Sequence, residues 1–302
     1  MDLPALFLLL LALTASYLTF SLTGLILSLS LWLLLLQPFL RFAAARAQPR
    51  KTPEEVIKTI QTYEDPFLYR SALEFALFRT YAIPSISRLL DATGEFRARA
   101  GRRYDDTDVI LCEVTENGVD SVRARAALRR LNEIHGVYKI TNDDHLYTLS
   151  VFVLEPARFF ARYGYRPYSD AEKAAATAVW TRIGTAMNIH SIPESYAAFD
   201  AFNVAYERDH MVHAAANTRV GNATMDLLLS AGPAAPLPRG PARKIFLAAM
   251  DDRLLDAMGY PRQHWALKKA VDVGLKARGA AMRWLLPPRM FAARRTKASL
   301  GG

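Results

Sequence analysis

The stretch RRLNEIHGVY, residues 129–138, places a histidine at the end of a predicted helix. If residues 121–135 are helical, Leu128, Leu131 and His135 share one face, because positions three and four apart lie on the same side of a helix. Burial of an imidazole disfavours its protonation and leaves a neutral nitrogen that can bind a metal such as a haem iron. His135 is therefore a candidate metal ligand, and the alternative is a structural histidine that is hydrogen-bonded to a carbonyl group.

A second pair of polar side chains is predicted to face the interior from RRYDDTDVILCEV, residues 102–114. Arg103, Thr107, Ile110 and Val114 follow one another at spacings of four, three and four and share a helical face. The pattern makes Arg103 and Thr107 candidate site residues. The alternative is that Arg103 forms an ion pair with a neighbouring aspartate and that Thr107 is an ordinary residue of the early helix.

A third candidate lies in YERDHMVH, residues 206–213, where Glu207, His210 and His213 are three residues apart on one helical face. Glu-x-x-His is a motif of carboxylate-bridged di-iron sites in helical bundles. Such a site needs a second copy of the motif and two further glutamates, and the sequence contains one copy. The other interpretation is a solvated polar face of a helix.

The remaining histidines and several aromatic residues show no metal-binding pattern. His145 is interpreted as an ordinary residue after NDD, His190 as a loop residue and His264 as a residue at a helix start. Packing in the core or at an interface is expected of Trp180, Tyr196, Trp265 and Trp284. None of these residues is predicted to take part in chemistry.

From residue 52 onward the sequence predicts a single all-α domain, because apolar residues recur at helical spacing and strand-like alternation is almost absent. Thr52, Pro53 and Glu55 are typical of a helix start, and SDAE at 169–172 is a second capping box. The predicted helices span 53–63, 66–80, 84–92, 105–117, 121–135, 143–163, 169–187, 193–211, 214–230, 242–258 and 263–284. The domain is expected to cover 52–290, between a membrane anchor with a basic flank at 1–51 and a basic tail at 291–302.

No charged side chain occurs from Leu3 to Leu40, whereas a bilayer core of about 30 Å needs only about 20 helical residues. Residues 3–40 therefore predict a segment embedded in the lipid bilayer, either one long helix or two short helices that turn at 21–24. A signal peptide cleaved near 43–47 is the alternative, although the apolar run is longer than such a peptide requires. The basic residues that follow favour a cytosolic location for the rest of the chain, and they are Arg41, Arg46, Arg50 and Lys51.

The formal charge of +9 raises nucleic-acid binding as a function. The basic clusters at 97–103, 123–130 and 294–297 lack aromatic interleaving and zinc-finger spacing, so no nucleic acid is expected as a partner. Basic surfaces that face anionic lipid headgroups or solvent explain the charge more simply. The single cysteine, Cys112, excludes an internal disulfide and agrees with a reducing compartment.

Several blocks of the sequence resemble one family of enzymes. The strongest are FALFRTYAIPSISRLLDATGEF (75–96), RRYDDTDVILCEVTENGVDS (102–121) and NDDHLYTLSVFVLEPARF (142–159). With AEKAAATAVWTRIGTAMNI (171–189), MDDRLLDAMGY (250–260) and LLPPR (285–289), they resemble the MpaB-type oxygenases, which are grouped with bacterial latex-clearing proteins. The resemblance covers nearly the whole chain after the predicted anchor.

The resemblance implies an all-α protein that holds haem b and uses dioxygen to cleave a carbon–carbon double bond in an isoprenoid or another lipophilic small molecule. Within it, His135 corresponds to the proximal haem ligand, and Arg103 and Thr107 correspond to a catalytic arginine and threonine pair beside the haem pocket. Rubber-cleaving relatives carry a lysine before that threonine, where this sequence has Asp106, so a lysine-gated iron site is not expected. No residue is predicted as the catalytic base.

The function expected from these observations is that of a membrane-anchored, haem-dependent oxygenase, located in the endoplasmic reticulum if the organism is eukaryotic. Two rival functions are a non-enzymatic helical scaffold at the membrane and a carboxylate-bridged non-haem iron oxidase. Neither the oligomeric state nor the individual substrate follows from the sequence.

Overall fold

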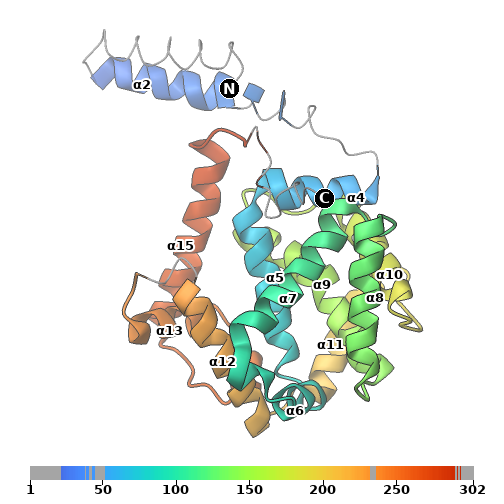
Figure 1. Ribbon diagram of the computed structural model, residues 1–302. Helices are drawn as coiled ribbons and strands as arrows, with labels where there is room; N and C mark the ends of the chain where they lie inside the picture. Colours follow the sequence, from blue (N-terminus) through green and yellow to red (C-terminus); the bar gives the residue numbers. More distant parts are fainter. Residues whose placement is uncertain are drawn as a thin grey trace.

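The structure of the protein is a computed structural model that describes residues 22–37, 39, 40, 43, 44, 52–231, 236–289, 291 and 293. Every regular element among these residues is a helix, which confirms the predicted all-α fold (Figure 1). In chain order the helices are α2 (Leu22–Leu31), the π-helix η1 (Trp32–Leu36), α4 (Pro53–Thr59), the π-helix η2 (Ile60–Glu64), α5 (Pro66–Thr80), α6 (Pro84–Ala92), α7 (Glu95–Asn117), α8 (Val122–Gly136), α9 (Asn142–Tyr163), α10 (Asp170–Ala186), α11 (Tyr196–His210), α12 (Ala215–Ala231), α13 (Arg239–Ala248), α14 (Asp252–Met258) and α15 (Trp265–Trp284).

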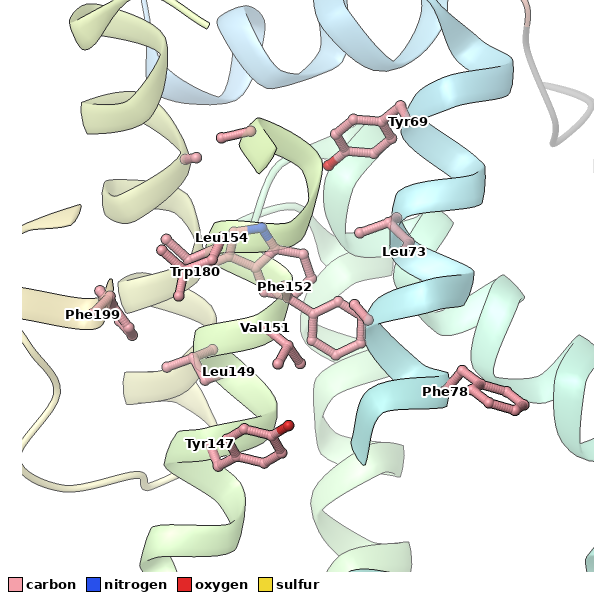
Figure 2. Packing of buried hydrophobic residues seen from close by; sticks show 14 of the residues in the cluster. Tyr69, Leu73, Phe78, Tyr147, Leu149, Val151, Phe152, Leu154, Trp180 and Phe199 are labelled. Atoms are coloured by element: carbon pink, nitrogen blue, oxygen red, sulfur yellow. The ribbon is translucent and has the colours of Figure 1, made fainter. Parts of the chain in front are cut away.

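The hydrophobic core lies around α9, which packs against α5, α10, α11 and α15. The N-cap residue Thr141 accepts a hydrogen bond from the backbone N–H of Asp144, so the start of α9 is well defined. Phe152 of α9 stacks on Trp180 of α10 with ring centroids 4.7 Å apart, and Figure 2 shows both rings among the buried side chains of this core. Burial on several sides explains why α9 is apolar over most of its circumference.

The four aromatic residues for which packing was predicted fall into two groups. Trp180 is buried in the core, as predicted, and Tyr196 at the start of α11 is partly buried against it. Trp265 and Trp284, at the two ends of α15, are exposed, so the core alternative is wrong for both. Both side chains therefore belong to the surface of the molecule.

The helix predicted at 105–117 begins ten residues earlier, because α7 starts at Glu95. Gly94 has a φ of 70°, in the left-handed region that glycine tolerates, and it separates α6 from α7. Arg99 departs from helical geometry with φ −148° and ψ 45°, which marks a kink. The early part of α7 is rich in arginine and lacks an apolar stripe, so hydrophobic periodicity did not reveal it.

The predicted helix 242–258 is wrong as a single element, because the chain forms α13 and α14 with a break between them. Asp251 lies at this break and accepts a hydrogen bond from the backbone N–H of Leu254, which caps α14. The same carboxylate binds Arg79 of α5 at 2.5 Å. The ion pair with a distant helix therefore favours the break over a continuous helix.

The predicted anchor at 3–40 lies only partly within the described residues, since 3–21 are outside them. Its described part forms α2 and η1, with many leucine side chains exposed. Among the residues that the structure describes, no helix has both the length and the apolar character needed to cross a membrane. Most of the basic flank before residue 52 and most of the tail at 291–302 also lie outside the described residues.

Candidate active site

A cavity of about 300 Å³ lies inside the helical domain, between α7, α8 and α9, with α5, α6 and α10 completing its wall. Most of the lining side chains are apolar, and they include Leu77, Leu90, Ile110, Leu131, Phe152 and Ile183. A small number of polar side chains interrupts this apolar wall. Such a cavity suits an apolar or amphipathic ligand that is oriented by a few polar contacts.

His135 lines this cavity from the last turn of α8, together with Leu128 and Leu131 of the same face. The interior orientation that helical spacing predicted for His135 is therefore present in the structure. A second imidazole lies close by, because His145 of α9 also lines the cavity, with its ring centroid 5.3 Å from that of His135 and the rings inclined by 39°. Two histidines from different helices thus meet in the wall of the cavity.

His145 was interpreted as an ordinary residue, and the structure places it in the wall of the cavity. A usable signal was present in the sequence, because His145, Thr148, Leu149 and Phe152 recur at helical spacing, and all four line the cavity. Burial lowers the pKa of His145, and the neighbouring carboxylate of Asp144 opposes this shift only in part. The imidazole of His145 is consequently neutral at neutral pH, with one nitrogen that accepts a hydrogen bond and one that donates.

Asp144 is a buried carboxylate in the cavity wall that sequence reasoning did not identify. Its Oδ1 accepts hydrogen bonds from Ser85 Oγ of α6 at 2.6 Å and from Tyr206 Oη of α11 at 2.8 Å. Burial, followed by this hydrogen bond, raises the pKa of Tyr206, so the phenol remains protonated and donates. Three helices therefore hold one carboxylate in a fixed orientation next to His145.

Thr107 lines the cavity from α7, and Ile110 and Val114 of the predicted face do so as well. Arg103 lies one helical turn before Thr107 on the same helix, and its side chain is outside the described part of the structure. Two charged residues, Asp106 of α7 and Lys139 of the segment between α8 and α9, also border the cavity and are exposed. These two charged residues thus lie toward solvent, whereas Asp144 is a buried charged residue within a mostly apolar wall.

Residues 74–288 match the sequence profile of a family described as "ER-bound oxygenase mpaB/B'/Rubber oxygenase, catalytic domain". The chain belongs to this family. The matched residues include every residue that lines the cavity. The cavity therefore lies within the catalytic domain that defines the family.

Individual members of the mpaB and rubber oxygenase family are similar to the chain over most of its length. The ER-bound oxygenase mpaB of Penicillium roqueforti (strain FM164) is 35% identical over 246 residues, which cover 74% of this chain and 82% of that relative. The ER-bound oxygenase mpaB' of Penicillium brevicompactum is 34% identical over 275 residues, 83% of this chain and 64% of the relative. The mpaB oxygenase of the same species is 33% identical over 218 residues, 65% of this chain and 56% of the relative. The alignments thus span less than two thirds of the last two relatives.

Membership in the mpaB and rubber oxygenase family makes the chain an oxidoreductase enzyme. It confirms the resemblance predicted from the sequence and favours an enzyme over the non-enzymatic scaffold. The family match concerns the catalytic domain and its chemistry as a class.

The carboxylate-bridged di-iron alternative is wrong, because Glu207 has another role in the structure. Its Oε1 and Oε2 accept hydrogen bonds from Arg79 Nε at 3.0 Å and Nη2 at 2.6 Å, and Tyr147 Oη donates to Oε1 at 3.1 Å. Helix α11 ends at His210, so His213 does not continue the helical face of the motif. No group of three or more histidine, cysteine, aspartate or glutamate side chains suited to a metal ion occurs among the described residues.

Proposed function

We propose that this protein is a haem-dependent oxygenase that holds haem b through His135 and uses dioxygen to cleave a carbon–carbon double bond in an isoprenoid or another lipophilic substrate. The observation that carries the proposal is the position of His135 in the wall of an apolar cavity inside the family's catalytic domain. A haem iron can be held by a single protein side chain, so one histidine, His135, would be sufficient to hold the group.

The residues of the cavity fit a haem group. A macrocycle that is largely apolar requires an apolar wall, and the wall supplied by α5 to α10 is mostly leucine, isoleucine and aromatic side chains. A neutral imidazole is the form that binds iron, and His135 would offer such a ring from the wall of the cavity. When bound, haem would supply the iron that activates dioxygen.

The chain itself contributes binding, orientation and exclusion of water. The apolar inner wall would bind the hydrocarbon part of the substrate and keep water away from the double bond. Thr107 Oγ1 can orient a polar ligand atom from α7, and Arg103, on the same helix, would supply a positive charge. His145 can exchange a proton at the cavity wall, because its imidazole is neutral and its neighbour Asp144 is fixed by Ser85 and Tyr206.

Lipid association forms the second part of the proposal. We infer that residues 3–40 embed in a bilayer and that the catalytic domain faces the cytosol, in the endoplasmic reticulum if the organism is eukaryotic. Three similar proteins are named ER-bound oxygenases, and the uncharged segment is followed by basic residues. A membrane location would also bring the cavity close to a lipophilic substrate. Alkaline carbonate extraction of membranes from an expressing cell is expected to leave the full chain in the pellet, and release into the supernatant would contradict embedding.

The absorption spectrum of the protein tests the haem site. The full chain, purified in detergent and supplied with haem, is expected to show a Soret band that His135→Ala weakens or abolishes. His190→Ala is the matched control, because His190 is exposed and lies outside the cavity, so its spectrum should equal that of the wild type. A folded wild-type protein that takes up no haem would contradict the proposal. An unchanged Soret band in His135→Ala would contradict the assignment of the ligand.

A further inference from the structure

We propose that the C-terminal end of α15 is a second lipid-contacting surface, which docks onto the interface of a bilayer that contains anionic phospholipid. We call this surface the α15 tip, and it consists of Arg283, Trp284, Leu285, Leu286, Arg289 and Phe291. The proposal rests on the membrane association proposed above, and it adds a contact made by the catalytic domain itself. A bilayer is the partner because the tip combines exposed apolar groups, positive charge and proximity to α2 and η1, which together are called the leucine-rich segment.

The large apolar side chains of the α15 tip are exposed. Trp284 is 49% exposed, Leu285 55%, Leu286 53% and Phe291 69%. Large apolar side chains that lie together at the surface of a soluble domain commonly mark an interaction site. A tryptophan with adjacent leucines is the composition of segments that insert at the boundary between headgroups and acyl chains.

Arginine side chains accompany the apolar groups of the tip. The guanidinium of Arg283 lies over the indole ring of Trp284, with Cζ 5.0 Å from the ring centroid, and Arg289 follows five residues later. In the sequence, further basic residues occur at 41–51 and at 294–297. Basic residues next to an apolar patch are attracted to the negative surface of anionic bilayers.

The tip is directly connected to the N-terminal leucine-rich segment. Gln37, which is buried, donates hydrogen bonds from Nε2 to the backbone oxygens of Arg283 at 3.1 Å and of Leu286 at 2.6 Å. Figure 1 shows the end of α15 reaching toward the N-terminal helix α2. On the N-terminal side, Leu25, Leu27 and Leu35 are exposed, so two exposed apolar surfaces lie on either side of one hydrogen-bonded junction. A bilayer can cover both surfaces at once.

The opposite end of α15 provides a contrast. Trp265 is 74% exposed, and bases close to it in the chain are paired with carboxylates, Lys268 with Asp252 at 2.6 Å and Arg262 with Asp256 at 2.6 Å. A helix of this length separates its two ends by about 28 Å, which is close to the thickness of a bilayer core. The two tryptophans therefore report on different environments, and only Trp284 is expected to contact lipid.

Fluorescence quenching by brominated lipid tests the α15 tip. The full chain carrying Trp32→Phe, which removes the tryptophan of η1, is reconstituted into vesicles of phosphatidylcholine and phosphatidylserine with or without bromine on the acyl chains. Brominated lipid is expected to quench part of the emission. Adding Trp284→Phe should abolish most of this quenching, whereas adding Trp265→Phe should leave it in place. Both substituted side chains are exposed, so both variants should fold, and circular dichroism checks this.

The possible outcomes separate the tip from the wider proposal. If the protein floats with the vesicles but quenching does not change with Trp284→Phe, the proposed lipid contact of the α15 tip is overturned. The proposed membrane association is then left intact. A protein that does not float with the vesicles would overturn both. Charge is tested by Arg283→Gln together with Arg289→Gln, which should lower quenching in anionic vesicles more than in pure phosphatidylcholine. A decrease in quenching that is equal in both kinds of vesicle would contradict the role of the arginines.

Discussion

Glu207→Gln is expected to destabilise the fold, because this carboxylate neutralises a buried arginine. The side chains of Arg79 and Glu207 are 12% and 7% exposed, and Glu207 accepts two hydrogen bonds from the guanidinium. Removing one partner of a buried ion pair costs about 3–5 kcal/mol, since the other charge stays buried. Asp251 at 2.5 Å and Glu155 at 3.8 Å still face Arg79, so the loss should lie near the lower limit, about 3 kcal/mol.

Thermal unfolding followed by circular dichroism measures this loss. For a domain of this size, about 1 kcal/mol corresponds to a change of about 2–4 °C in Tm, so the variant is expected to unfold about 6–12 °C below the wild type. Glu133→Gln is the control, because Glu133 pairs with Arg130 on the exposed face of α8 at 3.2 Å, with both side chains more than half exposed. An exposed pair contributes about 0–1 kcal/mol, so this Tm should change little.

A Tm of Glu207→Gln equal to that of the wild type would show that the Arg79 charge does not depend on Glu207. Metal content measured on the same samples is expected to be unchanged in the folded fraction, because Glu207 binds an arginine and a tyrosine. Loss of iron from a variant that remains fully folded would contradict the structural role assigned to Glu207.

Two further predictions concern packing and pH. Gly279→Ala should lower stability by about 1–3 kcal/mol, because the added Cβ would meet the backbone oxygens of Tyr163 and Gly164 where α15 packs on α9. Gly274→Ala should raise stability by up to about 1 kcal/mol, because its added Cβ would have no atom within 4 Å. Equal shifts of Tm in the same direction would contradict this contrast. Because burial lowers the pKa of His145, the unfolded chain binds its proton at a higher pH than the folded chain, so stability is lost as the pH falls through about 6.5. The free energy of unfolding, measured with urea at about pH 7.5 and about pH 5.5, should therefore fall less for His145→Gln than for the wild type. An equal fall would exclude His145 as a source of the pH dependence.

Much of the helical framework followed from the sequence, because helix formation is governed by neighbours three and four positions apart. The capping box at Thr52 and the one at Ser169 form in the structure as predicted. The face of α7 that carries Thr107, Ile110 and Val114 lines the cavity for the same local reason. Prediction failed at the start of α7, where helix formation proceeds without an apolar stripe, and at Asp251, where a contact with α5 interrupts a helix.

Prediction of the candidate site likewise depended on whether a residue had a signal in its local sequence. His135 could be identified from its place on an apolar helical face, and its proposed role as a haem ligand came from resemblance to a family that the comparisons confirm. His145 and Asp144 were missed, although the spacing of His145 with Phe152 offered a local signal. For Asp144 there was no such signal, since its partners Ser85 and Tyr206 are 59 and 62 residues away.

By itself the sequence determined the helical class, the inward direction of His135 and Thr107, the basic and apolar segments at the N-terminus, and the likeness to an oxygenase family. Tertiary structure alone decided that two histidines from α8 and α9 share one cavity and that Glu207 neutralises Arg79 across 128 residues of chain. It also decided that Gln37 joins the leucine-rich segment to the exposed end of α15. The physical reason is that helical periodicity specifies which face of a helix is apolar, whereas packing specifies which faces meet.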